Sequence, residues 1–252
     1  MVAARRKAAV SMPYRQIGRP TKGGPNRGGI VCVSDHASNQ VPEGIDLGID
    51  PALMNEHIAV DIGVEAVAEA MAEHHDIPAH LAMVSRLVVD LHREEDHPGV
   101  VPQSSDGHII HGNAGVDIEA RLSGIYRPYH EAMAKWLDEH APFLIISLHS
   151  FTPKLATSDE PRPWEVAFLY NEDDRAARLA IQFFEEEGLC VGDNEPYSGR
   201  QLNATMNRHA EPFGRPYLAT EIRQDLIASP EGQKHWAALL AKVASRVAQE
   251  LS

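Results

Sequence analysis

Short apolar runs alternate with helical patterns from Gly29 to the end of the chain, and this rhythm constrains the fold more than any other feature. The apolar runs span residues 29–34, 79–84, 87–91, 143–148, 165–170, 189–192 and 217–222. The helical patterns lie at about 52–75, 116–140, 173–187 and 231–250. Strands that alternate with helices form a sheet covered on both faces, so we expect residues 30–252 to be a single α/β domain. It should be a three-layer α/β/α sandwich with a mixed, largely parallel sheet.

Residues 1–29 differ from the rest of the chain in charge, because they carry seven Lys and Arg and no acidic residue. We expect this basic segment to be a loosely ordered extension, with a transit peptide as the alternative. The remaining 223 residues hold 16 basic against 36 acidic side chains, a formal charge of −20. Such an acidic body repels nucleic acid and anionic membranes, which argues against both as partners.

The lengths of the apolar runs and the positions of the two cysteines favour a soluble, cytoplasmic protein. No run approaches the ~18 apolar residues of a membrane span, so we expect a soluble protein. Cys32 and Cys190 are far apart and lack the spacing of a metal site, which is typical of a reducing cytoplasm. The sequence makes no prediction of oligomeric state.

Polar side chains end or flank four of the apolar runs. They are of types that bind metals, hold anions or move protons: His36 and Asn39; Arg86, Asp90, His92 and Arg93; His149 and Ser150; Glu221 and Arg223. Each alone is also typical of a structural hydrogen bond or ion pair. Because the carboxyl ends of parallel strands gather at one edge of a sheet, we expect these groups to converge into a site.

The helical pattern at 52–75 contains two candidates for a third metal ligand beside His36 and His149. His57 and Asp61 are four residues apart on one face of this predicted helix, so one of them could point into the site. A local hydrogen bond between the two is the alternative interpretation. Asn39 competes for the same role, although its neutral amide is a poorer zinc ligand than a carboxylate.

Six short motifs carry a resemblance to a known family. In chain order they are "SDHASNQVP", "HIAVDIG", "SRLVVDLHR", "LHSFTP", "NEPYSG" and "EIRQDLI". From about Ile30 to the C-terminal helix, the chain resembles the N-formylglutamate amidohydrolases. That family is similar to the zinc carboxypeptidases and succinylglutamate desuccinylases, which implies a phosphorylase/hydrolase-like α/β fold.

The resemblance also implies roles for individual residues. His36 matches the first zinc ligand, His149 the last ligand, and Glu221 the general base. Arg93 in "DLHR" resembles an arginine that fixes the substrate carboxylate. Asn39 occupies the place of the glutamate ligand in the HxxE motif, and this departure predicts Asp61 as the replacement, a weaker or different metal site, or lost catalysis.

The implied activity is a metal-dependent amidohydrolase that removes a formyl or other small acyl group from an acidic N-acyl amino acid. Zn²⁺ acidifies water, Glu221 takes its proton, and Arg93 or His92 helps the metal to stabilise the oxyanion. Candidate substrate-binding residues are Arg86, Arg93, Arg200, Arg223, Tyr197 and Ser150. Two alternatives remain: a non-catalytic relative that binds an acidic metabolite, and a metal-free serine hydrolase that uses Ser150 and His36.

Overall fold

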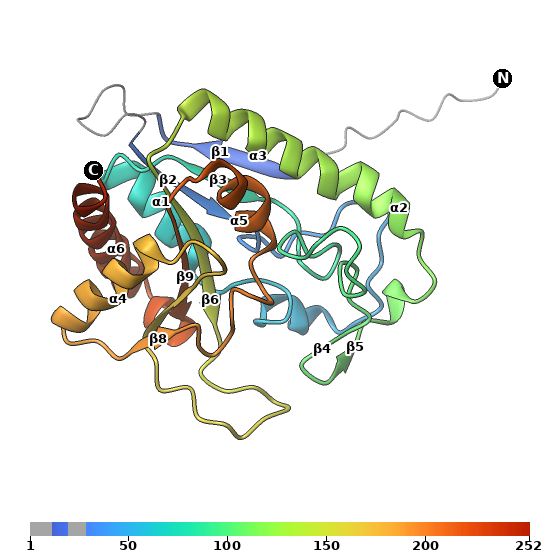
Figure 1. Cartoon of the computed structure of the whole chain (residues 1–252). Coiled ribbons are helices and arrows are strands. Elements are labelled where there is room, and N and C mark those ends of the chain that lie inside the picture. The colour runs from blue at the N-terminus through green and yellow to red at the C-terminus, as the bar shows by residue number, and fades with distance from the viewer. Residues whose placement is uncertain (1–11, 20–28) are drawn as a thin grey trace.

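The computed structural model describes residues 12–19 and 29–252, and a seven-stranded mixed sheet forms its centre (Figure 1). The strand order is β1-β3-β2-β6-β9-β7-β8. The strands are β1 (Tyr14–Ile17), β2 (Ile30–Ser34), β3 (Ala79–Ala82), β6 (Leu144–Phe151), β7 (Val166–Leu169), β8 (Val191–Asp193) and β9 (Tyr217–Arg223). The four central strands β3, β2, β6 and β9 are parallel, whereas β1 and β7 pair antiparallel with β3 and β9.

Helices cover both faces of the sheet, which confirms the predicted α/β class and the mixed sheet. One face carries α1 (Val64–His74), α4 (Arg175–Glu186) and α6 (Pro230–Glu250). The other face carries α3 (Arg127–His140) and α5 (Ala204–His209), and the short α2 (Ile118–Arg121) leads into α3. In β6, Leu144 and Ile146 pack into the first layer and Ile145 into the second, so the first half of the strand is apolar on both faces.

The predicted helix at 52–75 is wrong in its first half. Pro51–Asn55 form a short 3-10 helix, residues 56–63 are irregular, and only Val64–His74 are α-helical. Gly63 separates the two parts, because its φ of +85° is left-handed. A Cβ at this position would lie 2.3 Å from the carbonyl oxygen of Ile227, so only glycine fits.

The basic N-terminal segment is not loosely ordered throughout. Tyr14–Ile17 form β1, an edge strand in register with β3, and the prediction is wrong there. The Tyr14 ring stacks on His80 with ring centroids 5.0 Å apart, and Arg15 binds Glu65 and Glu69 of α1. The rest of the predicted extension, residues 1–11 and 20–28, lies outside the described residues.

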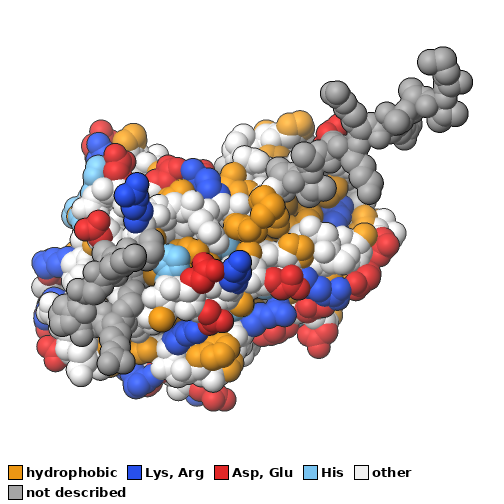
Figure 2. Space-filling view, turned by 90° about the horizontal axis from the view of Figure 1, so that it is seen from above, with side chains coloured by type: hydrophobic (Ala, Val, Ile, Leu, Met, Phe, Trp, Pro, Cys, Tyr) orange, Lys and Arg blue, Asp and Glu red, His pale blue; other side chains and the backbone are white. Residues whose placement is uncertain are grey.

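Residues 87–91 do not form the predicted strand. They are buried, but their backbone follows turns that connect β3 to the hairpin of β4 (Ser104–Ser105) and β5 (His108–Ile109). The hairpin lies in the connection between β3 and α2. None of the helices in the described part combines the length and apolar character that crossing a membrane requires. Figure 2 shows acidic and basic side chains interspersed on one face of the molecule.

Candidate active site

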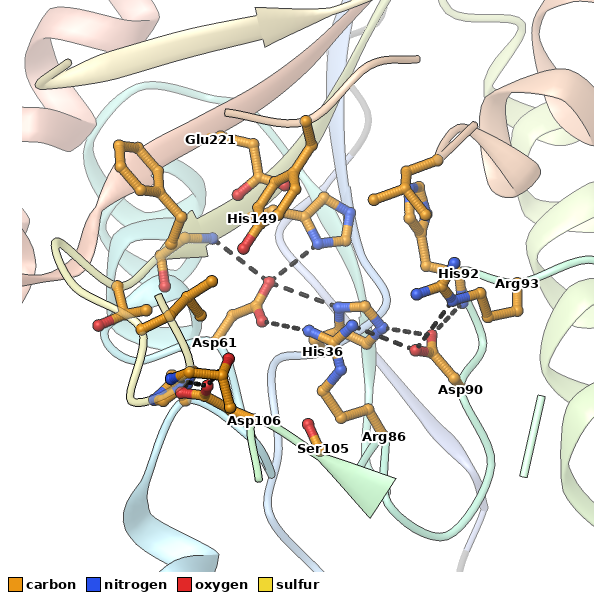
Figure 3. Close-up of a pocket in the computed structure, with 18 residues that line it drawn as sticks. His36, Asp61, Arg86, Asp90, His92, Arg93, Ser105, Asp106, His149 and Glu221 are labelled. Atoms are coloured by element: carbon orange, nitrogen blue, oxygen red, sulfur yellow. Dashed lines mark hydrogen bonds and ion pairs between the residues drawn. The ribbon is translucent and has the colours of Figure 1, made fainter. Parts of the chain in front are cut away.

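The pocket at the carboxyl edge of the central strands brings together the residues that the strand ends predict. His36 follows β2, while His149 and Glu221 are register partners on the adjacent parallel strands β6 and β9. Together with Asp61 they line a pocket with a cavity volume of about 250 Å³ (Figure 3). The parallel arrangement places these three strand ends side by side, as the sequence predicts.

His36, Asp61 and His149 form a compact, buried set of candidate metal ligands. One nitrogen or oxygen from each lies within 4.8 Å of the others. Asp61 Oδ2 is 2.9 Å from His149 Nδ1 and 3.5 Å from His36 Nδ1. Within the described residues, the buried His36 Nδ1 has no hydrogen-bond partner. Two imidazole nitrogens and one carboxylate are a donor set of catalytic zinc sites, and the unsatisfied nitrogen fits a metal ligand.

Asp90 fixes the orientation of His36. Its Oδ1 lies 2.7 Å from His36 Nε2, so His36 Nε2 donates a proton and Nδ1 faces Asp61. Burial and Arg86 lower the pKa of His36, but the carboxylates of Asp90 and Asp61 outweigh them and raise it to about 9. A carboxylate behind a histidine orients the ring and increases its basicity as a ligand.

Arg86 links the two carboxylates of this cluster. Its Nη1 donates to Asp61 Oδ1 at 3.2 Å, and its Nη2 donates to Asp90 Oδ2 at 3.1 Å. Arg86 therefore lines the pocket, but its guanidinium is already engaged by Asp61 of the ligand set and by Asp90.

Asp35 anchors a neighbouring buried network. Its carboxylate accepts hydrogen bonds from Tyr129 (2.8 Å), Thr205 (2.7 Å) and His92 Nδ1 (3.0 Å). Asp35, His92 and His149 also lie close enough to hold a metal ion. The set with Asp61 fits a metal better, because it includes His36 Nδ1, which has no hydrogen-bond partner among the described residues. Because Asp35 holds Nδ1 of His92, the other ring nitrogen is the one that remains for the pocket.

The carboxylate of Glu221 also lines the pocket. Among the described residues, no Lys, Arg or His forms an ion pair with it. Burial, followed by the negative charge of Asp61, raises the pKa of Glu221 to about 8. Burial followed by the charge of His92 lowers the pKa of His149 to about 4. The pocket thus holds a neutral imidazole and a carboxyl group whose proton affinity lies near neutral pH.

Asn39 and His57 do not join the ligand set. Asn39 donates to the carbonyl oxygen of Met54 and to Asn55 Oδ1, and His57 Nε2 binds Asp106. Asp61 is therefore the third member of the set, although it comes from an irregular segment and not from the predicted helix.

The other predicted site residues divide into two groups. Arg93, Tyr197 and Ser150 line the pocket, and Arg93 Nε lies 3.7 Å from Asp90 Oδ2. The Ser150 hydroxyl donates to the carbonyl oxygen of Ile62, so it does not pair with His36 as a serine nucleophile requires.

Arg223 and Arg200 lie away from the pocket lining. Arg223 binds Asp225, and its guanidinium also donates to the carbonyl oxygen of Pro163. The side chain of Arg200 is exposed. This placement does not support the predicted role of either arginine in substrate binding.

Sequence reasoning missed two residues beside the pocket. Arg162 binds the hydroxyl of Tyr197, and Asp106 binds His57 and the backbone of the loop at Ala156 and Thr157. Both lie in irregular loops, where no periodicity indicates the direction of a side chain. The local sequence of Asp106, "SDG", is a turn signal and contains no sign of a site.

Comparison with known proteins places the chain in a family. The family model described as N-formylglutamate amidohydrolase matches residues 28–228, whereas no curated protein matches in sequence. The gene product Atu2144 from Agrobacterium tumefaciens is 27% identical, with 96% of each chain covered and a TM-score of 0.86. N-formylglutamate amidohydrolase from Ralstonia eutropha JMP134 shares the fold at 19% identity and a TM-score of 0.71, over 95% of this chain and 98% of that one. The chain therefore belongs to the N-formylglutamate amidohydrolase family and is a hydrolase that acts on amides.

Proposed function

We propose that the chain is a metal-dependent amidohydrolase that removes the formyl group, or another small acyl group, from an acidic N-acyl amino acid such as N-formylglutamate. The family match supports an amide-cleaving hydrolase with a small-molecule substrate. The observation that carries the metal is His36 Nδ1, which is buried, lacks a hydrogen-bond partner in the described part of the chain, and lies 3.5 Å from Asp61 Oδ2.

His36, Asp61 and His149 would hold the ion, and zinc suits this donor set best. When bound, such an ion supplies Lewis acidity, which acidifies water and polarises a carbonyl oxygen. An ion in place of the proton on His36 would be held by two neutral imidazoles and one carboxylate, which would leave a net positive charge at the site. Asp90 keeps His36 in the tautomer whose Nδ1 is free for this purpose.

Glu221 would move the proton. Its carboxylate accepts a proton from the water that attacks the acyl carbon, and it returns that proton to the amine nitrogen as the C–N bond breaks. The products are a free carboxylic acid, formate for a formyl group, and an amino acid. The register pairing of Glu221 with His149 on adjacent parallel strands supports this role, because it places the carboxylate beside the candidate ligand set.

Arg93 and His92 would orient the substrate. Among the described residues, the only ionic contact of the Arg93 guanidinium is with Asp90 at 3.7 Å, so most of its donors are free there. The ring of His92 is held through Nδ1 by Asp35, which leaves its other nitrogen for a substrate oxygen. Donors fixed before the substrate arrives stabilise developing negative charge without reorganisation.

A non-catalytic binder of acidic metabolites is the weaker alternative. It depends on Asn39 as a defective ligand, but the side chain of Asn39 binds Met54 and Asn55 while Asp61 contacts both histidines. Glu221 also argues against a pure binder, because a carboxylate disfavours an acidic ligand.

The test combines metal analysis with a substrate screen. The purified protein should contain about one divalent ion per chain and should release formate from N-formyl-L-glutamate. A chelator should abolish the activity and added Zn²⁺ should restore it. Undiminished hydrolysis in metal-free protein, or no hydrolysis of any N-acyl amino acid by metal-loaded protein, would overturn the proposal.

A further inference from the structure

The cations around the pocket are not equally free to bind a ligand. Both ends of the Arg86 guanidinium are engaged, by Asp61 and by Asp90. Arg93 makes one long contact, 3.7 Å to Asp90, and has no hydrogen-bonded side-chain partner among the described residues. If the proposed function is correct, a substrate with two carboxylates needs a second binding group besides Arg93.

Arg162 lies in the loop that joins β6 to β7 and contacts two residues that line the pocket. Its Nη1 donates to the carbonyl oxygen of Thr152 at 3.2 Å and to the Tyr197 hydroxyl at 3.0 Å. Thr152 and Tyr197 both line the pocket. Nε and Nη2 of Arg162 have no hydrogen-bond partner in the part of the chain that the structure describes, so one edge of the guanidinium remains available.

Tyr197 complements this arginine. The Arg162 guanidinium carbon lies 5.1 Å from the centre of the Tyr197 ring, which restricts the arginine to one side of the tyrosine. The Tyr197 hydroxyl oxygen accepts a hydrogen bond from Arg162, so its own proton is free to be donated. No acceptor for that proton exists among the described residues. A guanidinium edge and a hydroxyl donor side by side match the two oxygens of a carboxylate.

The surroundings suit the side chain of an acidic amino acid. Arg93 contacts Asp90, the carboxylate bonded to His36, and therefore lies beside the candidate metal ligands. Arg162 contacts none of those ligands and contacts Tyr197 through both its hydroxyl and its ring. The apolar side chains of Leu155 and Leu202 also line the pocket, where methylene groups can pack.

We infer that Arg162 and the Tyr197 hydroxyl form a carboxylate subsite that binds the side-chain carboxylate of the N-acyl amino acid, while Arg93 binds the α-carboxylate. The subsite would make Arg162 the residue that selects acidic over neutral amino acids. The inference rests on the proposed function for the identity of the substrate, but binding of a simple dicarboxylate tests it independently of catalysis.

The kinetic test compares N-formyl-L-glutamate with N-formyl-L-glutamine, which has the same shape and no side-chain charge. Arg162→Met should lower kcat/KM for the glutamate substrate about 10–100-fold, mainly through KM, because a charge-assisted hydrogen bond is lost. It should leave kcat/KM for the glutamine substrate within about threefold of wild type. Arg162→Lys should restore part of the preference, and Tyr197→Phe should weaken it. The matched control is Arg246→Met on α6, where the arginine binds Glu186.

The binding test uses glutarate and its monoamide, titrated calorimetrically into the zinc-loaded protein. Wild type should bind glutarate more tightly than the monoamide, and Arg162→Met should remove that difference while Arg246→Met keeps it. Failure of wild type to hydrolyse any N-acyl amino acid would overturn the proposed function, and the titration alone would then decide the subsite. Equal binding of both ligands by wild type, or an unchanged preference for glutarate in Arg162→Met, would overturn the subsite.

Discussion

His149 and Glu221 are register partners on the adjacent parallel strands β6 and β9. A candidate metal ligand and a candidate proton acceptor therefore leave the sheet at the same level, and the backbone pairing of two buried strands fixes their separation. A site built on central strands is positioned more rigidly than one built on loops. The chemistry proposed above depends on this pairing.

Replacing Glu221 with glutamine tests the proton transfer. The amide has nearly the same shape but cannot accept a proton, so we expect kcat to fall by about 10²–10⁴-fold. The zinc content and the affinity for the product amino acid should not change. Steady-state rates and elemental analysis of the same preparation measure both quantities. Glu43→Gln, at an exposed loop position, is the matched control. Turnover of Glu221→Gln within a few-fold of wild type would assign Glu221 a structural role.

The metal content of two variants shows whether Asp61 or Asn39 is the third ligand. Asp61→Asn removes the charge that faces both histidines, so we expect the zinc content to fall from about one ion per chain to a small fraction. Asn39→Ala should keep full occupancy, because that side chain binds Met54 and Asn55. His149→Ala should lose the metal while the far-ultraviolet circular dichroism spectrum stays native. Full occupancy of Asp61→Asn, or metal loss in Asn39→Ala, would reverse the assignment.

Three buried histidines away from the pocket lining should make stability fall in acid. Burial lowers the pKa of His80 and His130 to about 3 and that of His209 to about 4, against ~6.5 in the unfolded chain. Below pH ~6.5 the unfolded chain binds these protons and the native protein does not. The free energy of unfolding should therefore fall as the pH drops to about 4, by up to ~1.4 kcal/mol per pH unit for each histidine. Above pH ~6.5 they are neutral in both states and contribute no slope.

Urea denaturation at pH 7, 6 and 5 measures this dependence. His209→Gln should reduce the slope by close to one proton's contribution, since glutamine does not titrate. His235→Gln, at an exposed position of α6, should leave the slope unchanged. Identical slopes for wild type and His209→Gln would show that His209 does not contribute.

Removal of β1 should destabilise the protein. A chain that starts at Pro20 loses the strand, the stacking of Tyr14 on His80 and the contact of Arg15 with α1. Half-buried apolar side chains and the strand pairing together suggest a loss of about 1–2 kcal/mol, or about 2–8 °C in Tm. A chain that starts at Met12 keeps β1 and is the matched comparison. Calorimetric melting of the two should show the difference, and equal Tm values would mean that the edge strand contributes nothing.

The strand ends made much of the site predictable. His36, His149 and Glu221 each follow or end an apolar run, and central parallel strands bring such positions together by geometry alone. The predicted fold class is confirmed for the same reason, since buried strands and amphipathic helices have distinct periods. Asp61 lines the pocket although the helix predicted around it is wrong, because the pattern at 52–75 does not show that Gly63 breaks the helix.

The failures share a physical cause. Residues 87–91 are apolar because turns bury them, and no neighbouring strand pairs with their backbone in the described structure. β1 escaped notice because an edge strand is only half-buried and Arg15 faces α1 from within a basic segment. The path of a loop places Arg162 beside Tyr197, and no local pattern encodes that path.

The bridge that Arg86 forms between Asp61 and Asp90 makes the pocket a single energetic unit. Asp61 contacts His149, Asp90 contacts His36, and one guanidinium joins both pairs. Loss of either carboxylate leaves a buried charge without its counterpart, so the cost of one substitution depends on the others and free energies for the three do not add. In evolution, substitutions of Arg86, Asp61 and Asp90 should therefore occur together, because a protein that has lost one of the three charges is unstable.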